Sequence, residues 1–161
     1  MSLLKNVVKG KVEKPAFIII YGPDKVGKST FASEAPETLF LDVEGGTFNI
    51  DVSRISNDKI ETWDDLKSHL NDVLNEDHDF ETLALDSLDR IEVLLHQHIC
   101  REQKKDNIEE CFGSFGKWVS GVSNYWSEFI NLLKKIREKR DMNVIVIGHS
   151  QTKPYNIVIF I

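Results

Sequence analysis

The sequence predicts an α/β fold with a mostly parallel sheet, formed by a single domain over residues 1–161. Short apolar runs alternate with longer segments whose apolar residues recur at helical spacing, and no internal repeat interrupts this alternation. The composition, 41% apolar and 29% charged residues, is that of a globular protein with one hydrophobic core. No apolar run approaches the roughly 18 residues that a membrane span requires, so we expect no membrane contact.

Five short apolar segments are expected to be strands. Residues 16–21 form a continuous apolar run, as in a strand buried on both faces of a sheet. The other expected strands are residues 38–41, 82–86, 143–148 and 157–161. The chain stops inside the last run without a polar ending, a pattern expected of a truncated chain or of an unusually short protein.

Four helices are expected between these strands, at residues 28–34, 63–74, 88–103 and 117–140. Thr62 is suited to cap the start of the second helix, which carries acidic residues in its first turn. The aromatic residues of the last helix fall on its apolar stripe, so we expect them to pack in the core.

The net charge and the cysteines indicate which binding partners and which cellular compartment to expect. The net charge of −6 means that bulk electrostatics do not indicate nucleic-acid binding, although a local basic surface is compatible with it. Cys100 and Cys111 lack metal-ligand spacing, so free thiols in a reducing cytoplasm are expected. The first residues also lack the apolar core of a secretion signal, which again favours the cytoplasm.

Residues 22–29 match the pattern G-x-x-x-x-G-K-[ST] at every fixed position. They lie between an expected buried strand and an expected helix, the arrangement that a phosphate-binding loop requires. Glycines let successive backbone N–H groups surround one anion, and the helix N-terminus adds its positive dipole end. The residues expected to bind ATP are Gly22, Pro23, Asp24, Lys25, Val26, Gly27, Lys28, Ser29 and Thr30.

Within this loop, Lys28 is expected to reach the β- and γ-phosphates and to act in catalysis, and the Ser29 hydroxyl is expected to ligate Mg²⁺. Thr30 is expected to contact the α-phosphate. The alternative interpretation is a glycine-rich turn with an exposed lysine.

Acidic residues at strand ends are candidates for the rest of the site. Asp86 ends an apolar strand and is the expected second Mg²⁺ ligand, although an acid there, like Asp89, could instead cap the next helix. Glu44 follows the second strand, where it could act as a base or orient water; the alternative is a Gly-Gly turn with solvated acids.

His149 follows the fourth expected strand. In the commonest topology of P-loop ATPases that strand lies between the P-loop strand and the strand that ends in the metal-binding acid. A side chain at its end would then lie near the γ-phosphate, where His149 could sense it by hydrogen bonding. A surface-loop histidine is the alternative.

Together these segments resemble the core of RecA-type ATPases. Residues 20–30 are similar to the RecA phosphate loop, and residues 40–44 resemble the segment that carries the catalytic glutamate. Residues 83–87 resemble the metal-binding strand ending in Asp-Ser. Residues 147–149 fall where RecA-like proteins place a Gln or His that senses the γ-phosphate.

The closer likeness, over roughly residues 14–153, is to phage-encoded RecA-like NTPases of the Sak-type recombination group, often described as AAA-domain proteins. It rests on Phe31-Ala32 before Ala35-Pro36, on residues 41–46, and on Phe115-Gly116-Lys117 ahead of a long helix.

The resemblance implies a three-layer fold with strand order 5-1-4-3-2. It also implies ATP hydrolysis coupled to single-stranded DNA, homo-oligomeric rings or filaments, and a role in phage recombination or replication in the host cytoplasm. The family continues well beyond its His-bearing strand, so the basic residues that would contact DNA or a neighbouring subunit are not identified here.

Two other functions remain open. A small-molecule P-loop kinase would need an acceptor pocket and an arginine-rich lid, and the arginines of this chain do not cluster as a lid. A nucleotide-gated binding module would bind ATP without hydrolysing it.

Overall fold

The computed structural model describes residues 7, 9–11, 13–113 and 117–150. The strands in this part of the chain are β1 (Phe17–Gly22), β2 (Thr38–Asp42), β3 (Ser53–Ile55), β4 (Thr82–Asp86) and β5 (Asn143–His149). The helices are α1 (Lys28–Ser33), α2 (Trp63–Asn75), α3 (Leu88–Gln103) and α4 (Lys117–Lys139), with the 3-10 turns η2 (Asn57–Lys59) and η3 (Ile108–Glu110). Each predicted helix, and each predicted strand that falls in this range, is confirmed to within one residue at either end.

The strands form one parallel sheet in the order β1-β5-β4-β2-β3. This confirms the α/β prediction and the central part of the predicted order, in which the His149 strand lies between the phosphate-loop strand and the Asp86 strand. The edge strand β3 was not predicted. The expected strand at residues 157–161 lies outside the described residues.

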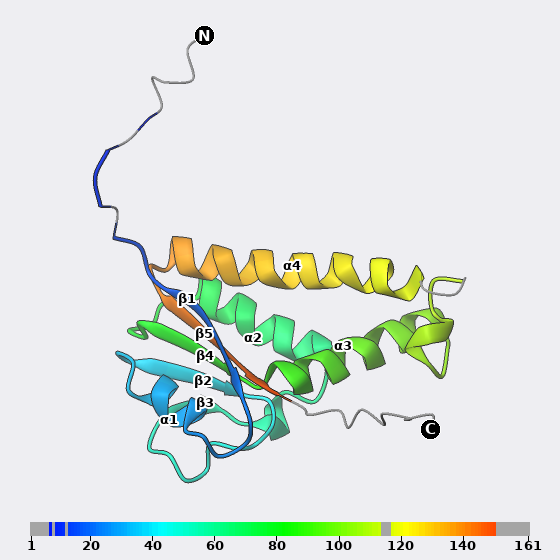
Figure 1. Cartoon of the computed structure of the whole chain (residues 1–161), viewed down its shortest axis with the longest axis horizontal. Coiled ribbons are helices and arrows are strands. Elements are labelled where there is room, and N and C mark those ends of the chain that lie inside the picture. The colour runs from blue at the N-terminus through cyan, green and yellow to red at the C-terminus, as the bar shows by residue number, and fades with distance from the viewer. Residues whose placement is uncertain (1–6, 8, 12, 114–116, 151–161) are drawn as a thin grey trace, which may run out of the picture.

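Helices cover both faces of the sheet, as the three-layer prediction requires. Figure 1 shows α2, α3 and α4 on one side of the sheet and the short α1 on the other. The larger core lies under α2, α3 and α4, where Trp63 contacts Phe129 and Trp126 at ring-centroid distances of 5.5 and 6.4 Å. The expectation that the aromatic residues of α4 pack in the core is therefore confirmed. A smaller apolar cluster around Ala32 and Phe40 joins α1 to the opposite face.

Local sequence explains where α2 begins. The Thr62 hydroxyl accepts a hydrogen bond from the Asp65 backbone N–H at 3.1 Å, and the Asp65 carboxylate accepts from the Thr62 N–H at 2.8 Å. This reciprocal capping box satisfies backbone donors that the first helical turn leaves free. The predicted cap is confirmed.

The expectation that β1 is buried on both faces is wrong. Ile19 is 58% exposed and Tyr21 78% exposed, whereas every residue of β2 and β4 is buried. Among the described strands β1 pairs only with β5, and both α3 and α4 pack against β5. An apolar run therefore predicted the strand but not how far its side chains are exposed.

Two further expectations concern the cysteines and membrane contact. Cys100 and Cys111 are free, as expected, with their sulfur atoms 4.0 Å apart; Cys111 is buried and Cys100 partly buried. In the part of the chain that the structure describes, every helix falls short of the combination of length and apolar character that a membrane span requires.

Candidate functional site

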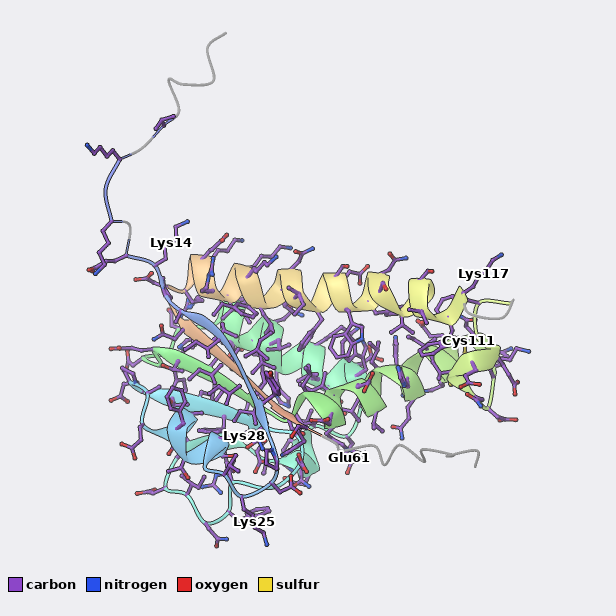
Figure 2. The ribbon with its side chains drawn as sticks, viewed as in Figure 1. Lys14, Lys25, Lys28, Glu61, Cys111 and Lys117 are labelled. Carbon is purple, nitrogen blue, oxygen red and sulfur yellow. The ribbon has the colours of Figure 1, made fainter. Side chains whose placement is uncertain are left out.

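The phosphate-loop sequence connects β1 to α1 and closes around its own lysine. Gly27 has φ +91°, a left-handed conformation that glycine adopts readily and that residues with a Cβ disfavour. The Lys28 ammonium donates hydrogen bonds to the carbonyls of Gly22 at 2.9 Å and Pro23 at 2.8 Å. Only 7% of Lys28 is exposed, so its charge lies inside the loop, on the side of the molecule away from α4 (Figure 2).

The first turn of α1 is joined directly to the end of β4. The Ser29 hydroxyl donates a hydrogen bond of 2.6 Å to Asp86 Oδ2, although the two residues are 57 positions apart. Asp86 is 4% exposed, and this burial raises the pKa of its carboxyl; the Ser29 hydrogen bond opposes the rise, and the charges of Asp42 and Glu44 add to it. A hydroxyl and a carboxylate at this spacing supply the kind of oxygen ligands that Mg²⁺ takes.

Asp42, at the end of β2, organises the loop that carries Glu44. Its fully buried carboxylate accepts hydrogen bonds from the backbone N–H groups of Gly45 at 2.7 Å, Gly46 at 3.0 Å and Thr47 at 3.0 Å, and from the Thr47 hydroxyl. Gly45 has φ +83°, and a Cβ there would lie 2.9 Å from the Asn57 amide nitrogen. The loop therefore needs both the acid and the glycine.

The sequence alone assigned no role to Asp42. The available signal was an aspartate followed closely by Gly-Gly-Thr, since such side chains bond backbone N–H groups a few residues on.

Glu44 lies beside the end of β4. The Ser87 hydroxyl donates to Glu44 Oε2, and the Glu44 backbone N–H donates to the Asp86 carbonyl at 3.1 Å. The peptide bond between Asp86 and Ser87 is cis. Ser87 is fully buried, and its hydroxyl contacts one oxygen of the Glu44 carboxylate. The Glu44 side chain itself is 48% exposed.

His149 ends β5 in register with Gly22 of β1, and three carboxylates surround its ring. Its Nδ1 lies 3.2 Å from Asp89 Oδ2 and 3.7 Å from Glu44 Oε2, and its Nε2 lies 3.5 Å from Asp24 Oδ1. The histidine thus connects the phosphate loop, the Glu44 loop and α3.

One cavity of about 410 Å³ brings most of the predicted site residues together. Its lining residues are Asp24, Lys25, Gly27, Lys28, Ser29, Thr30, Glu44, Gly46, Ile50, Asp86 and His149. Three residues of the predicted loop do not line it. Gly22 and Pro23 turn their carbonyls to Lys28, and Val26 is 59% exposed. Gly46 and Ile50 line the cavity but were not predicted to.

A glycine-containing loop that closes on a lysine, and a hydroxyl bonded to a strand-end carboxylate, define a domain of the P-loop NTPase type on this parallel sheet. The chain belongs to the AAA domain family, whose model matches residues 14–155. The match includes every site residue discussed above and indicates a nucleotide-binding domain. No curated protein matches the sequence.

Proposed function

We propose that this protein binds ATP with Mg²⁺ and hydrolyses it. The observation that carries the proposal is the 2.6 Å contact between Ser29 and Asp86, made beside the enclosed Lys28 ammonium and in the cavity that Glu44 and His149 also line. Phosphoryl transfer to water needs three components. They are a pair of oxygen atoms that bind the metal ion, a cation that binds the phosphates, and a carboxylate that orients the attacking water.

Each residue has a distinct role in this proposal. Lys28 binds the β- and γ-phosphates through charged hydrogen bonds. Ser29 and Asp86 would hold Mg²⁺, which would neutralise the negative charge that develops on the phosphate oxygens. The buried raised-pKa carboxyl of Asp86 suits this role, because a cation supplies the charge that favours its ionised form.

Glu44 orients the attacking water and accepts its proton. Ser87 fixes one oxygen of the Glu44 carboxylate, so the other is held in a defined direction and can serve as the base. His149 hydrogen-bonds the terminal phosphate. Because His149 also contacts the phosphate loop and the Glu44 loop, this hydrogen bond links the bound phosphate to both loops.

The wider role in this proposal is in phage DNA recombination or replication, as an oligomer acting on single-stranded DNA. It is supported by the resemblance of residues 41–46 and of the His149 strand to Sak-type proteins, and not by bulk charge, which is −6. Turnover should then rise when single-stranded DNA is added at low salt and fall back as salt increases, because phosphate contacts weaken with salt. A protein that at low salt neither binds single-stranded DNA nor is stimulated by it would contradict this wider role.

The site itself is tested with two variants. Lys28→Ala should weaken nucleotide binding by about 2–4 kcal/mol, because charged hydrogen bonds to phosphate are lost. Fluorescent nucleotide titration measures this change, with the exposed Lys135→Ala as the matched control. Unchanged affinity in Lys28→Ala would refute the phosphate-binding assignment.

Glu44→Gln should keep nucleotide affinity and reduce phosphate release about 100-fold or more, because the amide cannot accept a proton. Glu81→Gln, an exposed acid at the opposite end of the sheet, is the control. A nucleotide that stays intact with the wild-type protein in Mg²⁺ would favour a non-hydrolysing binding module instead.

A further inference from the structure

We infer that Asp89 is a positioning residue that orients the His149 ring so that Nε2 faces the terminal phosphate of the bound nucleotide. The inference rests on the proposed function, since it concerns the same cavity. It assigns a task to an acid that sequence patterns place only in the first turn of a helix.

A single carboxylate oxygen holds both parts of His149. Asp89 Oδ2 accepts the His149 backbone N–H at 2.7 Å and lies 3.2 Å from Nδ1 of the same residue. The backbone contact fixes the end of β5, and the ring contact selects the side-chain direction. Because α3 starts directly after β4 and packs against β5, the carboxylate is carried by a rigid element.

Asp89 is the closest carboxylate to Nδ1. The alternative partner, Glu44 Oε2, is 3.7 Å away and already accepts the Ser87 hydroxyl. Carboxylate oxygens accept hydrogen bonds, so our inference places a hydrogen on Nδ1 and directs it to Asp89, the nearer of the two. In a histidine, the partner of one ring nitrogen determines what the other can do.

The other ring nitrogen faces the phosphate loop. Nε2 lies 3.5 Å from Oδ1 of Asp24, and His149 lines the cavity with 22% of its side chain exposed. A phosphate oxygen can only accept a hydrogen bond, so the proposed contact is one in which Nε2 donates. The acidic groups that lie against the ring come from three places in the fold: Asp24 of the phosphate loop, Glu44 after β2 and Asp89 of α3.

A purely structural role for Asp89 makes different predictions. A carboxylate in the first turn of a helix stabilises that helix through its dipole, and its loss would lower stability without changing the histidine ring. Ser87, at the N-cap of α3, makes no side-chain capping bond. The hydrogen bonds that the structure assigns to the Asp89 carboxylate both go to His149.

The test combines nuclear magnetic resonance of ¹⁵N-labelled histidine rings with ATP turnover. The chain has five histidines, and the His149 signals are identified by their absence in His149→Ala. In the nucleotide-free wild type we expect a protonated Nδ1, and in Asp89→Ala a ring that averages between tautomers. Adding Mg²⁺ and a non-hydrolysable ATP analogue should shift Nε2 in the wild type and shift it less in Asp89→Ala.

Turnover gives the second measurement. Asp89→Ala should lower kcat about 10- to 100-fold, the usual effect of removing a carboxylate that orients a functional histidine, while KM changes little. Asp89→Asn keeps an acceptor oxygen and should recover part of this loss. The double variant Asp89→Ala/His149→Ala should be no slower than His149→Ala, because Asp89 acts through the ring. Glu92→Gln, an exposed acid on the same helix, is the control.

Specific results would overturn the inference. Additive losses in the double variant, or an unchanged His149 ring in Asp89→Ala together with a lowered melting temperature, would make Asp89 a structural residue only. If the wild type does not hydrolyse ATP, the proposed function fails, while the ring spectra of the nucleotide-free protein still decide whether Asp89 orients His149.

Discussion

The face of the sheet that α2, α3 and α4 cover differs in chemistry from the edge of the sheet where the strands end. Under α2, α3 and α4 the sheet is covered by a cluster of buried apolar side chains that includes Trp63 and Phe129. At the carboxyl ends of the strands several buried side chains are instead charged: Lys28, Asp42 and Asp86 are each less than 9% exposed. Apolar burial stabilises a fold, whereas buried charge costs free energy unless partners offset it.

This difference indicates that stability and the proposed function are supplied by different parts of the same strands. β4 is apolar through Leu85 and ends in Asp86, so a single strand contributes to both regions. The apolar layer can hold the charged edge in place because the parallel sheet is rigid. Substitutions in the two regions should therefore have opposite effects on stability.

The largest effect is expected in the apolar layer. Trp63→Ala should lower the free energy of unfolding by about 3–5 kcal/mol, because Trp63 is 2% exposed and its removal leaves a cavity against Phe129 and Trp126. Chemical denaturation measures this change. Val119→Ala on α4, where the side chain is 54% exposed, should stay within about 0.5 kcal/mol of the wild type. A cost below 1 kcal/mol for Trp63→Ala would show that this layer does not dominate stability.

An intermediate effect of opposite sign is expected at the charged edge. Asp86→Asn should raise the free energy of unfolding at pH 7 without Mg²⁺ by about 0.5–2 kcal/mol, the usual gain when a destabilising functional group is replaced. The reason is that burial raises the pKa of this carboxyl, so the folded state holds the ionised form at a cost. The same variant should lose Mg²⁺-dependent nucleotide binding.

The pH dependence of this gain has a definite sign. A raised pKa means that the folded protein takes up a proton more readily than the unfolded chain, so the cost of ionised Asp86 is relieved as pH falls. The advantage of Asp86→Asn should shrink as pH falls through the raised pKa toward the ordinary value of 3.8. Melting curves between pH 7 and 4 measure it, with the exposed Asp79→Asn as control. A gain that grows toward low pH would contradict the assignment.

The smallest effect is expected between α3 and α4, far from the charged edge. The Tyr125 hydroxyl donates a 2.7 Å hydrogen bond to Glu102, and this bond raises the pKa of Tyr125 to about 12. Tyr125→Phe should cost about 1 kcal/mol at pH 8. Because the folded pKa is raised, the contribution is complete below about pH 10 and is lost as pH rises toward 12.

Denaturant unfolding of Tyr125→Phe and wild type at pH 8 and near pH 12 tests this window. Tyr21→Phe, at a ring that is 78% exposed, is the matched control at pH 8. A difference that persists unchanged above pH 12 would mean that packing, and not the hydrogen bond, distinguishes tyrosine from phenylalanine here.

Sequence patterns predicted long and strongly periodic elements well. The bounds of α3 and β4 agree with expectation, and the Thr62 cap lies where a hydroxyl precedes an apolar-periodic run. The three-residue strand β3 was missed because so short a segment has no measurable period. The exposure of Ile19 was also missed, since an apolar run by itself does not show which of its side chains other elements cover.

The sequence by itself determined which segments become strands and helices, where the phosphate loop lies and which acids end strands, because hydrophobic period, caps and glycine spacing are local properties. Only the tertiary structure decided that Ser87 contacts Glu44 and that Asp89 contacts His149. Those contacts depend on which elements lie side by side and in what register, and pairing in a parallel sheet brings together residues that no local pattern connects.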